Sequence, residues 1–111
     1  MPVLINAETQ ETKVSVNISR KLIHLNSLMS VIVDFTNGPQ TEPDPPHSHP
    51  HEQITYVAEG ELFVFIAGEK KRLSKGDMFA VPGGIPHCIQ MLSPNVRLID
   101  SFSPIREDFI K

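Results

Sequence analysis

The sequence predicts an all-β protein built as a sandwich or barrel, and three observations support this class. No segment keeps an apolar period of 3.6 residues over ten or more positions, as an amphipathic helix would. Short apolar or alternating segments recur about every eight to twelve residues, and glycine or proline turns separate them. A jelly roll is the version of this architecture whose mouth commonly holds a small ligand, so a jelly roll is the fold that we expect.

Length and charge limit the partners that the protein can have. The chain of 111 residues fits one domain over 1–111, and its one cysteine, Cys88, cannot form an internal disulfide. The N-terminus lacks the charged start and apolar run of a signal peptide, and all apolar runs are far shorter than the roughly 20 residues that cross a bilayer. A net charge of -3 and a pI near 5.9 lack the basic excess that nucleic acid binding requires. We expect a cytoplasmic protein with neither a nucleic acid nor a membrane as partner.

The N-terminal region is expected to form an arm followed by a half-buried strand. Residues 1–12 show no sustained period, which predicts an arm or an edge strand. Because such arms often pack on a second subunit, we expect a homodimer. The pattern then alternates, with Val14, Val16 and Ile18 on one face, and this predicts a strand over 14–19.

The rest of the chain is expected to continue as short strands joined by turns. The predicted strands, each bounded by turn residues, cover 22–25, 29–35, 54–57, 62–67, 70–73, 78–81, 87–91 and 96–102. The turn over 58–61 predicts that the strands on its two sides pair as a hairpin. Four prolines between residues 39 and 46 predict an irregular loop, because proline cannot donate a ladder hydrogen bond. The tail over 103–111 could hold a single helical turn.

Three imidazoles and one amide crowd into the stretch from His47 to Gln53. His47 and His49 lie two residues apart, which puts both side chains on one face of an extended chain, and Gln53 shares their parity. A β fold could return His87, in the segment GGIPHCIQM, to the same place. Neutral imidazoles are the commonest protein ligands of zinc, iron, copper and nickel. We therefore predict that His47, His49 and His87 bind one metal ion, with Gln53 as a further contact.

The first of these segments resembles a motif of the cupin family, whose members are small double-stranded β-helix barrels. The family motif reads G-x5-H-x-H-x3-4-E-x6-G. The stretch His47-x-His49-x3-Gln53-x6-Gly60 reproduces each spacing after the opening glycine, in whose place Thr41 stands. Gln53 takes the place of the usual glutamate.

The segment around His87 resembles the second cupin motif. That motif, G-x5-P-x-G-x2-H-x3-N, is matched by Gly76, Pro82, Gly84 and His87, with Met91 in place of the asparagine. The two motifs cover the middle of the chain, and the strand pattern extends the match over most of the rest. The resemblance implies a cupin jelly roll.

The C-terminal residues indicate which group of cupins the chain resembles. The stretch Asp100-x-Phe102-x-Pro104-x-Arg106 is similar to the tail of the cupins of pectin and alginate breakdown, which linearise 4,5-unsaturated uronates. The resemblance implies one divalent ion (nickel, zinc, manganese or iron) and a small anionic sugar as substrate. It also implies site roles for seven residues, the metal ligands His47, His49, Gln53 and His87 and the catalytic residues Asp100, Phe102 and Arg106.

Three residues keep an alternative interpretation. His51 shares the parity of His47, but using it in place of His47 would break the spacing of the first motif, so we expect it at the rim of the site. Asp100 could be a buried carboxylate satisfied by backbone donors. Arg106 could pair with a neighbouring acidic residue instead of clamping a substrate carboxylate.

The amide at position 53 predicts the charge of the ligand. A glutamate would cancel one unit of the ion's charge, whereas three imidazoles and an amide leave a divalent charge in the pocket. Because the low dielectric of a barrel interior strengthens this field, we expect an anionic ligand such as a uronate.

Two other functions stay open. They are a metal-dependent dioxygenase of the quercetinase type, which usually keeps the glutamate, and a non-catalytic sugar-binding cupin.

Overall fold

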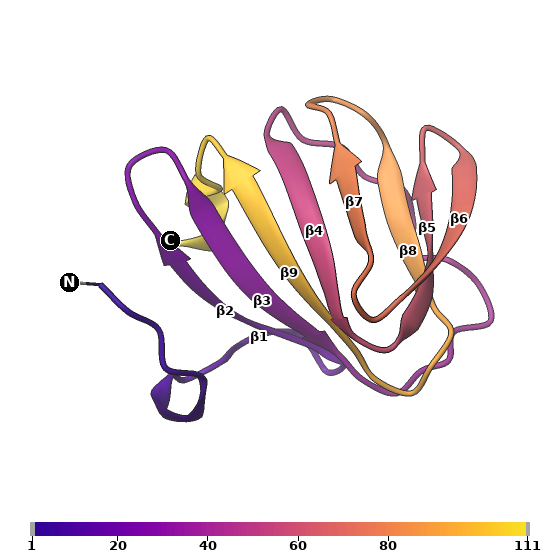
Figure 1. Cartoon of the computed structure of the whole chain (residues 1–111), viewed down its shortest axis with the longest axis horizontal. Coiled ribbons are helices and arrows are strands. Elements are labelled where there is room, and N and C mark those ends of the chain that lie inside the picture. The colour runs from indigo at the N-terminus through magenta and orange to yellow at the C-terminus, as the bar shows by residue number, and fades with distance from the viewer. Residues whose placement is uncertain (1, 111) are drawn as a thin grey trace.

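The computed structural model describes residues 2–110 and confirms the predicted all-β class; Met1 of the predicted arm and Lys111 of the tail lie outside these residues. The described strands form two antiparallel sheets that face each other (Figure 1). The larger sheet has the order β1 (Thr12–Ser15), β2 (Ile18–His24), β3 (Met29–Phe35), β9 (Val96–Ser103), β4 (Glu52–Glu59) and β7 (Met78–Val81). The smaller sheet has the order β6 (Glu69–Ser74), β5 (Glu61–Ile66) and β8 (His87–Met91). Helical structure within 2–110 is limited to the 3-10 turns η1 (Asn6–Glu8) and η2 (Glu107–Phe109).

Strand β4 shows how the sheets divide their side chains between the interior and the surface. Gln53, Thr55 and Val57 are buried, whereas Ile54 and Tyr56 between them are exposed. Two clusters of buried apolar side chains fill the interior, one of Val57, Leu62, Val64, Met91, Val96 and Leu98, the other of Met29, Val31, Val33 and Phe102. Gln53 and Thr55 therefore interrupt an otherwise apolar interior, which marks their surroundings as the place to look for a site.

The predicted hairpin between 54–57 and 62–67 is wrong. β4 pairs with β7 and β9, whereas β5 pairs with β6 and β8 in the other sheet. The turn at Gly60 carries the chain from one sheet to the other. Gly60 has a φ of +87°, and a Cβ at this position would lie 2.3 Å from the carbonyl oxygen of Asn95. A glycine turn fits a hairpin and a corner between sheets equally well, so the local pattern could not separate the two.

The predicted strand over 14–19 is also wrong, because the chain turns back on itself after Ser15. β1 ends there and pairs with β2, with Ser15 opposite Ile18. Val14 and Val16 are 51% and 84% exposed. β1 is the edge strand of the larger sheet and all its residues are exposed, so its apolar alternation does not lead to burial.

Both ends of the described chain pack on the larger sheet. The arm is tied to β2 by Lys21, whose Nζ donates to the backbone oxygen of Asn6 at 2.8 Å and to its side-chain oxygen at 2.9 Å. The tail forms the predicted single turn, η2, and its Ile105 and Phe109 pack on the apolar cluster that contains Phe102. No helix within 2–110 is long and apolar enough to span a membrane.

The contact between Gly60 and Asn95 leads to a stability prediction with a matched control. Gly60 and Gly68 both have positive φ, but a Cβ at Gly68 would meet nothing within 4 Å. We expect Gly68→Ala to lower the free energy of unfolding by about 1 to 2 kcal/mol, the cost of left-handed backbone. Gly60→Ala adds a backbone clash and should cost about 3 kcal/mol or more. Urea unfolding of both variants measures the difference, and equal losses would show that the corner tolerates a side chain.

Candidate functional site

Backbone hydrogen bonds hold the proline-rich loop against β8 and so bring two of the predicted ligands together. Along the loop over 39–46, the amides of Gln40 and Asp44 donate to carbonyl oxygens of β8 at 2.9 and 3.0 Å. His47 and His87 then exchange both backbone hydrogen bonds, at 3.0 and 2.9 Å. The prolines lie at positions where the loop donates no bond to β8, so they do not disturb this pairing.

A glycine turn fixes the backbone of His49 in the same way. The amide of Gly84 donates to the carbonyl oxygen of His49 at 2.8 Å. A Cβ at Gly83 would lie 2.4 Å from the carbonyl oxygen of Pro50, so only glycine allows this approach. The segment before β8 therefore contacts the first motif segment at His49 and Pro50, and His87 follows it at the start of the strand.

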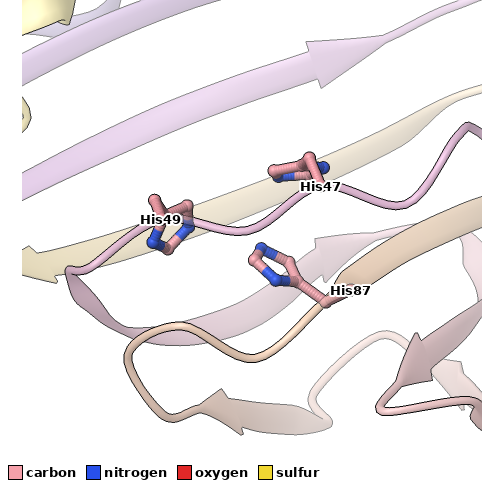
Figure 2. A group of neighbouring side chains, drawn as sticks. All are labelled: His47, His49 and His87. Atoms are coloured by element: carbon pink, nitrogen blue, oxygen red, sulfur yellow. The ribbon is translucent and has the colours of Figure 1, made fainter.

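His47, His49 and His87 meet in one group (Figure 2). The ring centroids of His47 and His87 are 4.3 Å apart, those of His49 and His87 are 4.9 Å apart, and those of His47 and His49 are 6.0 Å apart. One nitrogen from each ring can be chosen so that all three lie within 4.8 Å of one another. His49 and His87 are buried and His47 is exposed, so the group borders solvent on the His47 side.

Hydrogen bonds to backbone carbonyls settle which nitrogen two of these rings present. Nδ1 of His49 lies 3.0 Å from the carbonyl oxygen of His51, and Nδ1 of His87 lies 2.9 Å from that of Ile85. Because a carbonyl oxygen can only accept, both Nδ1 atoms carry the proton and both Nε2 atoms keep a lone pair. Nε2 of His87 is buried and has no hydrogen-bond partner among the described residues. A buried lone pair without a partner is the arrangement that a cation satisfies.

Gln53 presents a further lone pair to the same place. Its Nε2 donates to the hydroxyl of Thr55 at 2.9 Å, which turns its Oε1 toward Nε2 of His49 at 3.0 Å. Neither of these two facing atoms carries a proton, so their approach is unfavourable unless a cation lies near both. The donor set of three imidazoles and one amide therefore fits a divalent metal ion.

The surroundings of His47 and His87 favour the neutral form of their imidazoles. Burial lowers the pKa of His47 and of His87 below the usual value for imidazole, and the positive charge of Arg106 lowers both pKa values further. Neutral imidazole is the form that ligates. His51 lies beside the group, with its ring centroid 5.5 Å from that of His49, and its carbonyl oxygen orients that ring.

The register between β4 and β9 brings Asp100 to Gln53. Thr55 stands opposite Asp100 and Gln53 stands opposite Phe102. The Thr55 hydroxyl donates to Asp100 Oδ1 at 2.6 Å, and Gln53 Nε2 lies 3.5 Å from the same oxygen. Burial of the carboxyl group raises the pKa of Asp100 to about 6, against the opposing effects of the Thr55 hydrogen bond and the Arg106 charge.

The other two predicted catalytic residues lie beside the imidazoles, but one of them already has a partner. Phe102 is buried, with its ring centroid 5.6 Å from that of His49. The Arg106 guanidinium lies 5.2 Å from the centroid of the Phe102 ring. Both Nε and Nη2 of Arg106 donate to Asp108, at 3.2 and 3.0 Å. The ion pair with a neighbouring acidic residue, one of the two interpretations of Arg106, is therefore present.

A cavity of about 260 Å³ joins these residues between the two sheets. Six of the seven predicted site residues line it, namely His47, Gln53, His87, Asp100, Phe102 and Arg106. Sequence analysis missed two polar residues here, Thr55, which binds Asp100, and Arg20 of β2, which lines the cavity. Each had a signal in the sequence. Thr55 shares the parity of Gln53, and Arg20 interrupts the apolar alternation between Ile18 and Leu22.

The fold and the histidine group define the class of protein. A family model described as Cupin domain matches residues 33–101, and the chain belongs to this family. This result confirms both the predicted family and the predicted jelly roll.

Relatives resemble the chain over nearly its whole length. It is 39% identical to the pectin degradation protein KdgF of Dickeya dadantii (strain 3937), over 96% of each chain. The structure is similar to that of KdgF from Halomonas sp., with a TM-score of 0.89 and 40% identity over 98% of each chain. It is also similar to an RmlC-like cupin from Shewanella frigidimarina NCIMB 400, with a TM-score of 0.86 and 34% identity over 96% of this chain and 93% of that one. The predicted resemblance to a cupin of pectin breakdown is confirmed.

The histidine group predicts that a divalent metal stabilises the fold. Protein stripped with a chelator should gain about 2 to 3 kcal/mol of unfolding free energy when Zn²⁺ or Ni²⁺ is added at about a hundred times its Kd. His87→Ala should lose most of this gain, because it removes the buried Nε2 that lacks a partner. Thermal unfolding with and without metal measures the effect. His51→Ala is the matched control, and loss of the gain in this variant as well would place His51 among the ligands.

Proposed function

We propose that this protein is a metal-dependent isomerase that converts 4,5-unsaturated monouronates, released by pectin or alginate breakdown, to linear 5-keto-4-deoxyuronate. The observation that carries the proposal is the composition of one cavity. Two of the three grouped imidazoles, those of His47 and His87, and the amide of Gln53 line it together with the carboxyl group of Asp100 and the guanidinium of Arg106. The near full-length similarity to a pectin degradation protein supports the same conclusion.

The reaction moves one proton and breaks one bond. In the cyclic substrate C5 carries the ring oxygen and shares a double bond with C4. Removing the proton of the C1 hydroxyl forms the C1 aldehyde and breaks the bond between C1 and the ring oxygen, which leaves an enolate at C5. Protonation at C4 then gives the C5 ketone. The sum is an isomerisation that needs neither an oxidant nor a second substrate.

The residues of the cavity divide this work. Asp100 takes the hydroxyl proton and returns it to C4, and the hydrogen bond from Thr55 holds its carboxyl group in place. Phe102 forms a wall of the cavity against the sugar ring, and Arg106 adds positive charge. His47, His49, Gln53 and His87 would hold the metal ion. When bound, the ion supplies a Lewis acid that stabilises negative charge on a substrate oxygen.

The size of the cavity favours a single sugar over a chain of sugars. Its volume of about 260 Å³ lies just below the range of about 300 to 1,000 Å³ typical of pockets for drug-sized ligands. The positive charges in and around it suit a carboxylate. A monouronate meets both conditions.

The expected homodimer and cytoplasmic location are part of the same proposal. Val3 and Ile5 of the N-terminal arm are 67% and 52% exposed, and this apolar surface is the kind that a second subunit covers. A monomer mass in light scattering would contradict the dimer.

The activity and the role of Asp100 can be tested together. Metal-loaded protein mixed with 4,5-unsaturated galacturonate should accelerate the loss of the conjugated ultraviolet absorbance, equally in air and under nitrogen. Asp100→Asn should lower kcat by about 10² to 10⁴, because it removes the proton carrier and keeps the shape. Its metal affinity should be unchanged. Full rate in the variant would remove Asp100 from the mechanism, oxygen uptake would favour the dioxygenase, and binding without turnover would favour a sugar-binding cupin.

A second prediction concerns the charge set by Gln53. Gln53→Glu adds a negative charge beside the imidazoles and should tighten Zn²⁺ binding while raising the KM for the uronate, each by about tenfold. Calorimetry with Zn²⁺ and initial rates measure the two effects. Gln10→Glu makes the same charge change in the exposed arm and is the control. An unchanged KM in Gln53→Glu would mean that the neutral ligand set does not select the anion.

A further inference from the structure

Arg20 is a charged residue on an inward apolar stripe. It lies on β2 between Ile18 and Leu22, both of which pack on the apolar cluster around Phe102, and its side chain lines the cavity. Arg20 is half-buried, and this burial lowers the pKa of its guanidinium. A partly desolvated guanidinium costs stability unless something compensates it, so its presence in the cavity needs an explanation.

The donors of Arg20 are not used within the described chain. Its Nε is buried without a hydrogen-bond partner, and no carboxylate among residues 2–110 lies within ion-pair distance of it. Arg106 is the opposite case, because its Nε and Nη2 are both bound by Asp108. Of the two guanidinium groups that line the cavity, Arg20 is the one without a carboxylate partner among residues 2–110.

The two arginines share one aromatic ring and so lie close together. The Arg20 guanidinium carbon is 3.8 Å from the centroid of the Phe109 ring, and that of Arg106 is 4.3 Å from the same centroid. Their separation is therefore no larger than the sum of these two distances. The charge of Arg106 disfavours that of Arg20, while Asp108 favours it. Asp108 pairs with Arg106, so it leaves the guanidinium of Arg20 without a carboxylate partner of its own.

The aromatic rings connect this positive pair to the histidine group. The ring centroid of Phe102 is 5.6 Å from that of His49 and 5.8 Å from that of Phe109, on which Arg20 lies. Ring contacts thus run from His49 through Phe102 and Phe109 to Arg20, which lines the same cavity as His47 and His87. A sugar acid has the matching layout, with a carboxylate at one end of its ring and hydroxyl groups around the rest.

We propose that Arg20 binds the carboxylate of the substrate as a bidentate partner, and that Arg106 supports the charge of this site while it stays paired with Asp108. The inference rests on the proposed function, because it takes a uronate as the ligand. It makes Arg20 a positioning residue, which sets where the ring lies relative to Asp100. A guanidinium fork matches a carboxylate better than an ammonium group does, so lysine should replace Arg20 only in part.

Ligand pairs that differ only in charge test this assignment. Zinc-loaded protein is titrated by calorimetry with galacturonate, which lacks the C4–C5 double bond and is not consumed, and with its uncharged methyl ester. Arg20→Met should weaken galacturonate binding about 10- to 100-fold and change ester binding less than about twofold. Arg20→Lys should fall between. In turnover of the unsaturated uronate, Arg20→Met should raise KM and leave kcat within about threefold.

The controls separate a local role from a general one. Arg72→Met removes the same charge from an exposed strand of the smaller sheet and should change neither ligand's affinity. If Arg20→Met binds galacturonate as the wild type does, or loses acid and ester alike, the inference is overturned while the isomerase proposal stands. The same holds if Arg106→Met alone loses the preference for the acid. If Arg20→Met does not fold, the titrations of Arg20→Lys with galacturonate and with its methyl ester test the inference in its place. Wild-type protein that neither binds nor converts a uronate would overturn both proposals.

Discussion

The backbone pairing between His47 and His87 is the contact on which the site depends. The two residues are distant in the sequence, and their amides and carbonyls bond reciprocally at 3.0 and 2.9 Å. Once these main-chain bonds form, the two imidazoles need only adopt the right rotamers to meet. The turn before β8 does the same for His49 through its backbone. The main chain therefore brings the candidate ligands together without an ion, which would lower the conformational cost of binding one.

The cavity combines a neutral ligand set with charges held further away. His49, His87 and Gln53 are buried and carry no formal charge when they present their lone pairs. The formal charges belong to Asp44, Asp100, Arg20 and Arg106, whose side chains line the same space. None of the four candidate ligands is a carboxylate, and the two guanidinium groups lie at the aromatic end, beside Phe109. Both features attract a carboxylate, and they do so from different sides of the cavity.

The sequence was sufficient for the parts of the fold and the site that depend on local spacing. The parity of His47, His49 and Gln53 and the turn before His87 place four candidate ligands without any knowledge of pairing. Which strands pair is a long-range property, and the hairpin after β4 was predicted wrongly because one glycine turn fits two topologies. Thr55 gains its role only from the residue opposite it on β9.

Burial is a second property that the local sequence pattern leaves undetermined, as Arg20 and Val14 show. Alternation indicates which residues share a face, but not whether another sheet covers that face. Val14 lies on the uncovered edge and is exposed, whereas Arg20, two strand positions from the apolar cluster's Leu22, lines the interior. A charged residue within an alternating apolar pattern therefore indicates a functional site only when the structure shows that its face of the strand is covered.

The hydrogen bonds of Thr55 make the side chains at positions 53 and 100 depend on each other. A threonine hydroxyl has a single proton, and here it goes to Asp100 while the oxygen accepts from the Gln53 amide. A carboxylate at position 53 would face an oxygen with no proton left to give. Gln53→Glu in this chain would therefore lose the hydrogen bond to Thr55, unless Asp100 were protonated and released the hydroxyl proton. One hydroxyl proton thus couples the residue at position 53 on β4 to Asp100 on β9.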